Sequence, residues 1–118
     1  MATDGMRKYN IERMRGYFGE PAQMYIVLRL VSESRTQSGI ETLFDGSDLG
    51  RLGTYIGNLT KSKMVCKNRS SFELTNDSRK ILEALREIEM RAGVYELTKS
   101  GREDLKYLAK QIGTGTGL

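Results

Sequence analysis

The sequence contains no histidine, no tryptophan, one cysteine and one proline. Without histidine, the chain lacks the commonest general base and the commonest transition-metal ligand. Cys66 alone provides neither a disulfide framework nor a cysteine metal site. We also find no nucleophile paired with a base and no phosphate-binding loop. We therefore expect no enzymatic activity, no cofactor and no metal.

Long apolar runs are also missing. The most apolar stretch, Met24 to Val31, is interrupted by Arg29 and is much shorter than the roughly 20 residues of a membrane-spanning helix. The first residues, with Asp4 and Arg7, lack the apolar core of a signal peptide. The chain has 118 residues, of which 38% are hydrophobic and 29% charged, so we expect one domain, in the cytoplasm and away from membranes.

The positive charge is concentrated in one stretch. Between Ser47 and Phe72 the sequence has five basic side chains and one acidic one, a net charge of +4 that equals the net charge of the whole chain. The remaining residues are therefore neutral in sum. A local positive field on a neutral body indicates a polyanionic partner.

The spacing of apolar residues predicts several helices in the first half of the chain. A weak helix over residues 6–18 should follow a loose start, and a helix over residues 22–33, apolar on nearly all sides, should be buried. Ser38 and Glu41 have capping-box spacing at the start of a short helix. A further helix over residues 47–61 would have one apolar face, made by Leu49, Leu52, Ile56 and Leu59.

Three glycines, Gly50, Gly53 and Gly57, lie on one flank of this last helix. Each glycine in a helix interior costs about 1 kcal/mol relative to alanine. One interpretation is that the backbone approaches a phosphate or another helix closely at this flank. The other is a soft helix that is held in place by its apolar face.

A hairpin should follow this helix. Met64-Val65 and Phe72 to Leu74 are strand-like runs on either side of the polar turn Lys67 to Ser71. The run Phe72 to Thr75 is echoed by Tyr95 to Thr98 at an offset of 23 residues. Either copy is a candidate for the closing strand, and we favour the first because its turn is compact.

Two helices are expected in the last third of the chain. The first begins at Asn76 or Asp77 and runs to Ala92, with an apolar stripe of Ile81, Leu85 and Ile88. The second begins near a capping box of Ser100 and Glu103, with a stripe of Leu105, Leu108, Ala109 and Ile112. These stripes exceed what one small domain needs, so we expect a homodimer, and we expect residues 113–118 to be disordered.

The order of these elements carries a family resemblance. Residues 22–75 resemble the winged helix-turn-helix domain of transcriptional regulators such as the MarR and PadR families, and Asn58 to Val65 resembles the exit from the recognition helix into the wing. The fold implied is mainly α with a small β-hairpin. It comprises an N-terminal helical extension (1–20), a winged helix-turn-helix core (21–75), C-terminal helices for dimerisation (76–112) and the tail (113–118).

The resemblance implies that residues 47–61 enter the major groove of DNA. Arg51 would then donate to a guanine edge and Asn58 would pair with adenine, the geometries that suit those bases. Thr54 and Tyr55 would touch a thymine methyl group or a phosphate.

The wing, residues 64–75, would lie on the DNA backbone and minor groove. Lys61, Lys63 and Lys67 would contact phosphates, which contribute affinity without sequence information. Arg69 at the wing tip would reach the minor groove or its rim.

The expected function is therefore sequence-specific binding of double-stranded DNA by a dimeric, nucleoid-associated transcriptional repressor. A DNA-binding plasmid partition or replication factor would have the same features. A winged-helix module that binds an acidic protein partner is the alternative from another class. The sequence does not identify a small-molecule effector.

Overall fold

The computed structural model describes residues 3–44 and 46–112, with side chains for residues 7–44 and 49–112. The expected disorder of residues 113–118 lies outside this part of the chain. Helix α1 (Thr3–Phe18) begins three residues before Met6, so the expectation of a loose start is wrong from Thr3 onward.

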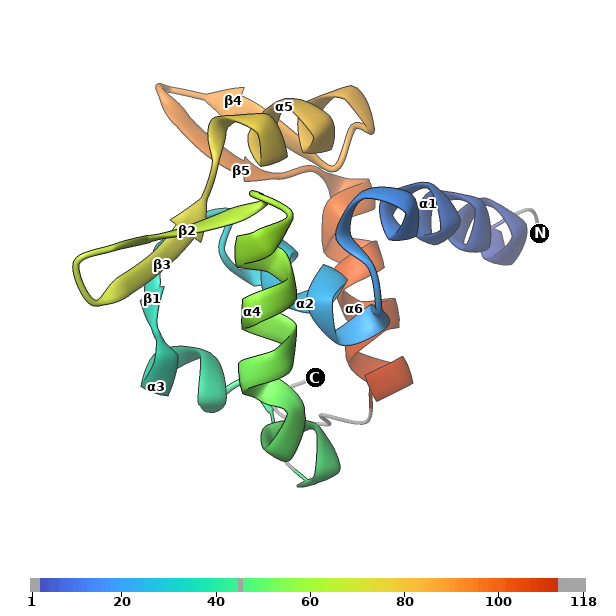
Figure 1. Cartoon of the computed structure of the whole chain (residues 1–118). Coiled ribbons are helices and arrows are strands. Elements are labelled where there is room, and N and C mark those ends of the chain that lie inside the picture. The colour runs from blue at the N-terminus through green and yellow to red at the C-terminus, as the bar shows by residue number, and fades with distance from the viewer. Residues whose placement is uncertain (1–2, 45, 113–118) are drawn as a thin grey trace.

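Helix α2 (Pro21–Arg29) is the centre of the fold, and α1 and α6 (Lys99–Ile112) lie against it (Figure 1). Residues 22–28 are all buried, which confirms the predicted central helix although it ends four residues early. No helix in the described residues combines the length and apolarity needed to cross a bilayer. The core is completed by side chains from α1 and α6: Ile11, Met14, Phe18, Leu108 and Ala109.

Three short elements link α2 to the next full helix. They are β1 (Arg35–Thr36), α3 (Gln37–Glu41) and the 3-10 helix η1 (Gly46–Arg51), followed by α4 (Leu52–Lys61). The helix predicted over residues 47–61 is therefore α-helical only from Leu52. The predicted Ser38 cap is also wrong, because the Thr36 hydroxyl accepts the N–H of Gly39 at 3.1 Å and starts α3.

Strands β2 (Val65–Asn68) and β3 (Ser71–Leu74) form an antiparallel hairpin with Arg69 and Ser70 at its turn. Strand β1 pairs with the other edge of β3, so the strand order is β1-β3-β2. The expectation that the run beginning at Phe72 closes this hairpin is confirmed.

The helix predicted from Asn76 to Ala92 is wrong. Helix α5 (Asn76–Ala84) ends early, and a second hairpin follows, made of β4 (Ile88–Arg91) and β5 (Val94–Leu97). The chain leaves α5 through Arg86, whose φ of 63° is left-handed, and turns at Ala92 and Gly93, with φ of 53° and 80°. Residues 76–112 are therefore two helices separated by a hairpin.

The two hairpins are built alike, at the offset of 23 residues seen in the sequence. Lys63 before the first hairpin and Arg86 before the second have φ of 62° and 63°. At the two turns, Arg69 and Ala92 have φ of 61° and 53°. Each unit consists of a helix, a left-handed residue and a hairpin, so the echo in the sequence marks a structural repeat.

A threonine closes each unit and starts the next helix. The hydroxyls of Thr75 and Thr98 donate to the carbonyl oxygens of Lys63 and Arg86, both at 2.7 Å. They also accept the backbone N–H three residues ahead, at 3.2 Å from Ser78 and 2.9 Å from Gly101. The predicted caps at Asn76 or Asp77 and at Ser100 are therefore wrong.

The apolar stripes of the last third pack inside the protein. Leu82, Ile88 and Leu108 are fully buried, and Ile81, Leu85, Leu105 and Ile112 pack against the same core. Each stripe therefore contributes to the protein's own core, and the homodimer stays a prediction.

Candidate nucleic-acid interface

Helix α4 divides into a buried face and an outer face. Leu52, Tyr55, Ile56 and Leu59 are buried in the core, and this burial holds in place a helix that its glycines would otherwise weaken. The outer face carries small and polar exposed residues: Gly53, Thr54, Gly57, Asn58, Thr60 and Lys61. In Figure 1, α4 runs upright beside the hairpin β2–β3, so these two elements share one side of the molecule.

The glycine flank of α4 is open. Gly53 and Gly57 of α4, and Gly50 in the preceding η1, are exposed, and a methyl group added to any of them would meet nothing within 4 Å. No other element of the described chain therefore packs on this flank. This excludes close packing of the flank against another helix of the same chain and leaves two interpretations, approach to a phosphate and a soft helix held in place by its apolar face. The flank is open to an external ligand.

The basic side chains of the first hairpin point outward. Lys63, Lys67 and Arg69 are exposed, and Lys67 lies with its Nζ atom 5.6 Å from the centre of the Phe72 ring. Arg69 occupies the turn in a left-handed conformation. Together with Lys61 at the end of α4, these residues form what we call the basic surface.

Arg51 stands at the start of α4 and is held loosely. Its side chain is 59% exposed and lies 3.6 Å from the Glu20 carboxylate, in an ion pair whose other member is half exposed as well. Its guanidinium lies 5.2 Å from the centre of the Tyr55 ring. Exposed ion pairs of this kind contribute little, so Arg51 can exchange Glu20 for another acceptor.

Tyr55 is not a surface residue. Only 2% of it is exposed, because its ring points from α4 into the core, where it helps to anchor the helix. The prediction that Tyr55 touches DNA is therefore wrong.

Asn58 is exposed but also has a structural role that the sequence did not reveal. Its Nδ2 atom donates to the Gln23 side chain at 2.9 Å, and Gln23 in turn donates to the carbonyl oxygen of Phe18 at 2.6 Å. The nearly buried Gln23 thus connects α4 to the turn between α1 and α2. Sequence reasoning missed Gln23, because its partners lie in two other segments.

The two hairpins differ in charge. From its left-handed residue to its closing threonine, the first hairpin (residues 63–75) has three basic residues and one acidic residue. The second hairpin, over the same span (residues 86–98), has two basic and three acidic residues. The two hairpins therefore share a backbone conformation and have exposed turns, but only the first carries a basic surface.

A buried carboxyl pair supports the second unit. Arg7 of α1 donates to Asp104 of α6 and to Glu103 at 2.6 Å, and Asp104 and Glu87 are fully buried. Neither oxygen of the Glu87 carboxyl has a hydrogen-bond partner in the described part of the chain, which disfavours its charged form. Burial, with Asp104 adding to it, raises the pKa of Glu87 to about 9.

Neither a metal site nor a known relative adds to this description. Among the described side chains, residues 7–44 and 49–112, no three acidic or cysteine groups are placed so that they could hold a metal ion. In comparisons with known proteins, no family model, curated protein or solved structure matches the chain.

Proposed function

We propose that this protein is a winged helix-turn-helix protein that binds double-stranded DNA in a sequence-dependent way and represses transcription. The order α2-β1-α3-α4-β2-β3 and the sheet order β1-β3-β2 support the fold. The observation that carries the function is the arrangement of the glycine flank of α4 beside the basic surface. The outer face of α4 would enter the major groove, and the first hairpin would lie on the backbone.

The roles of the side chains follow from their geometry. Arg51, whose partner Glu20 is exposed, is the base reader, and Thr54 lies beside the glycines on the same exposed face. The amide nitrogen of Asn58 donates to Gln23, so Asn58 contacts a base with its amide oxygen. The basic surface holds phosphates.

The proposal includes a homodimer at the nucleoid. One short helix buries too little surface for high specificity, so two copies on a palindromic site supply the rest. Because the C-terminal stripes pack against the protein's own core and are at least partly buried, the contact between copies would use other exposed side chains. Tyr17 on the outer side of α1 is an exposed large aromatic residue of this kind.

Fluorescence anisotropy with a random duplex, at low and at physiological salt, tests the proposal, followed by selection from a random library. Salt-sensitive binding, an enriched palindrome and two protomers per site are expected. The absence of binding at low salt would contradict it and would favour an acidic protein partner for the basic surface. A plasmid partition or replication factor would bind DNA equally well but would enrich sites at a partition or replication locus.

Removing charge from the hairpin should weaken binding to all duplexes alike. For Lys67→Gln and Arg69→Gln, each lost phosphate contact should reduce the slope of log K against log salt by about 1.

Arg51→Ala should instead relax the sequence preference at one base pair, by about 1–3 kcal/mol. Arg91→Gln, an exposed cation on the second hairpin, is the matched control and should leave both quantities unchanged. If Arg91→Gln weakened DNA binding as much as Arg69→Gln does, the first hairpin would have no special role in binding.

Adding a methyl group to the glycine flank should separate stability from binding. Gly53→Ala and Gly57→Ala should each raise the free energy of unfolding by about 1 kcal/mol, because both sites are open. The same methyl groups should weaken DNA binding about tenfold, since they would stand between the helix backbone and the duplex. Gly16→Ala in α1, also an open site, should stabilise the protein without any effect on binding. Unchanged affinity in the two α4 variants would show that DNA does not contact this flank.

A further inference from the structure

A groove lies between α1, the end of α5 and the first turn of α6. Its volume is about 510 Å³, within the range of small-molecule sites, and its lining includes Tyr9, Asn10, Arg13, Leu85, Arg86 and Ser100. In Figure 1, α1 lies on the right of the molecule and the hairpin β2–β3 on the left. The groove is therefore separate from the basic surface.

The charged residues of this groove are two arginines. Arg13 comes from α1 and Arg86 from the turn after α5, and no acidic residue is among the lining residues. Neither arginine forms an ion pair within 4 Å in the described part of the chain. The guanidinium of Arg13 lies 5.4 Å from the centre of the Tyr9 ring, which keeps it at the rim. The lining of the groove thus carries two positive charges and no carboxylate, and Arg13 also interacts with the buried Glu87.

Ser100 adds a directed hydroxyl group. Its Oγ atom accepts N–H groups from Asn10 at 3.2 Å and from Arg7 at 3.4 Å. Both neighbours are donors, so the hydrogen of the hydroxyl is available for an acceptor in the groove. With the two guanidinium groups, the polar lining consists mainly of donors, which suits an oxyanion.

The remaining wall is apolar. Tyr9 is 60% exposed, and Leu85 is half buried beside Ala84. An anion alone would leave this wall unused, whereas a ligand with a ring or a carbon chain would cover it.

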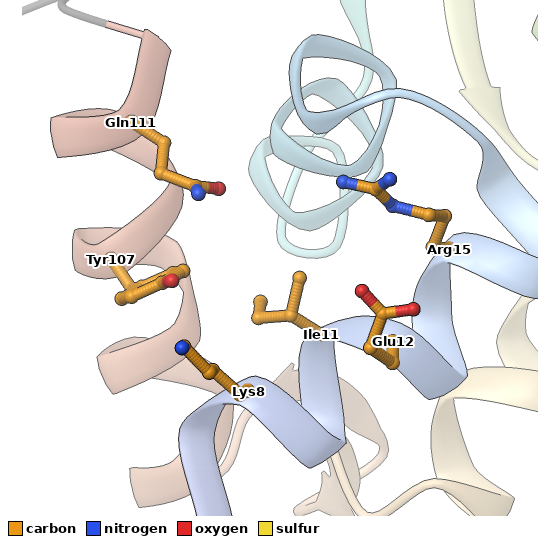
Figure 2. Close-up of a pocket in the computed structure, with 6 residues that line it drawn as sticks. All are labelled: Lys8, Ile11, Glu12, Arg15, Tyr107 and Gln111. Carbon is orange, nitrogen blue, oxygen red and sulfur yellow. The ribbon is translucent and has the colours of Figure 1, made fainter. Parts of the chain in front are cut away.

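A neighbouring groove between α1 and α6 differs in both size and charge. Its volume is about 280 Å³. Figure 2 shows its two walls: α1 contributes Lys8, Glu12 and Arg15, and α6 contributes Tyr107 and Gln111. The carboxylate of Glu12 offsets part of the positive charge there. The groove at Arg13 and Arg86 differs from this one because no acidic residue is among its lining residues.

We propose that the groove between α1, α5 and α6 binds a small organic phosphate monoester. Arg13, Arg86 and the Ser100 hydroxyl hold the phosphate, and the carbon part lies on Tyr9, Ala84 and Leu85. This site goes beyond the proposed DNA binding and does not depend on it.

The test is an NMR titration of amide shifts at low salt, with inorganic phosphate and phenyl phosphate as probes. Saturable shifts should cluster at Tyr9, Arg13, Arg86 and Ser100, and phenyl phosphate should bind about tenfold more tightly because it covers the apolar wall. Arg13→Gln and Arg86→Gln should each weaken phenyl phosphate about tenfold. Lys67→Gln on the basic surface is the matched control and should not change this affinity.

Two results would overturn the site. One is a set of non-saturating shifts at exposed basic residues throughout the protein, and the other is shifts confined to α4 and the hairpin β2–β3. Circular dichroism spectra of both arginine variants should match that of the unchanged protein, since both side chains are exposed. The site and the DNA proposal fail separately, because Arg13→Gln should leave DNA anisotropy unaltered.

Discussion

Replacing Gly101 with alanine is expected to lower the free energy of unfolding by about 3 kcal/mol, the upper part of the range for overpacked sites. A methyl group at this position would lie 2.2 Å from the backbone oxygen of Glu87 and 3.2 Å from a methyl carbon of Leu97. A backbone oxygen cannot swing aside as a flexible side chain would. Helix α6 would have to move away from the second hairpin, and the Thr98 hydrogen bonds that cap it would stretch. Urea unfolding followed by circular dichroism measures the loss.

The matched control for Gly101 is Ser78, which has the same place after the first hairpin as Gly101 has after the second. That position already accommodates a side chain, and its buried hydroxyl has no hydrogen-bond partner in the described part of the chain. Ser78→Ala should therefore leave the free energy of unfolding unchanged or raise it slightly. If Gly101→Ala unfolded at the same urea concentration as the unchanged protein, the close approach of α6 to the second hairpin would be wrong.

Replacing Glu87 with glutamine should change how stability depends on pH. The unfolded chain ionises Glu87 near its ordinary pKa of 4.5, whereas the folded protein keeps the proton until about pH 9. A raised pKa in the folded state means that this contribution to stability is complete below pH 4.5 and is lost progressively up to pH 9. Glutamine cannot ionise, so the Glu87→Gln variant should not show this loss.

The expected difference between the two proteins grows by about 3 kcal/mol from pH 4.5 to pH 7, at about 1.4 kcal/mol per pH unit. Urea unfolding at several pH values measures it. Arg7, Arg13, Asp104 and Glu103 are the other charged groups around this site, and they remain in both proteins. Glu89→Gln, exposed on β4, is the control and should follow the unchanged protein. Parallel stability curves for Glu87→Gln and the unchanged protein would contradict the buried proton.

Where local pattern and tertiary packing agree, the sequence was enough to predict the element. Helix α2 was predicted as buried because the apolar residues of the predicted helix, Met24 to Leu28 with Leu30 and Val31, occupy nearly all sides, and residues 22–28 are buried in the structure. Helix α6 contains the predicted stripe of Leu105, Leu108, Ala109 and Ile112, and Leu108 and Ala109 are buried. The first hairpin was predicted from its polar turn.

The second hairpin was missed because two periodicities overlapped. Ile81, Leu85 and Ile88 have helical spacing, but Ile88 belongs to a strand whose partner is Leu97. The break occurs at Arg86, a residue type that rarely marks a left-handed turn. The echo between Phe72 and Tyr95 contained the missing information, because it aligns residues 65–68 with residues 88–91.

At the candidate interface, the sequence identified exposed charge better than it identified the partners of each side chain. Lys67 and Arg69 are exposed, as their place in a polar turn suggested. Tyr55 and Asn58 differ from expectation because their environment depends on the core and on Gln23, which lie outside the helix. Amphipathic spacing assigns a residue to a face, but residues at the border of two faces are assigned by tertiary contacts.

The position of α2 between α1 and α6 also affects how the protein is made. On the ribosome, α2 is complete once Arg29 has been added, but the helix that covers it is complete only at Ile112. At the usual speed of translation this interval lasts roughly 4–17 s. Through that time an apolar helix lacks one of its covering surfaces, while both hairpins can form from contacts within each short unit. Nascent chains halted before α6 are therefore the form of this protein most exposed to aggregation and to chaperone binding.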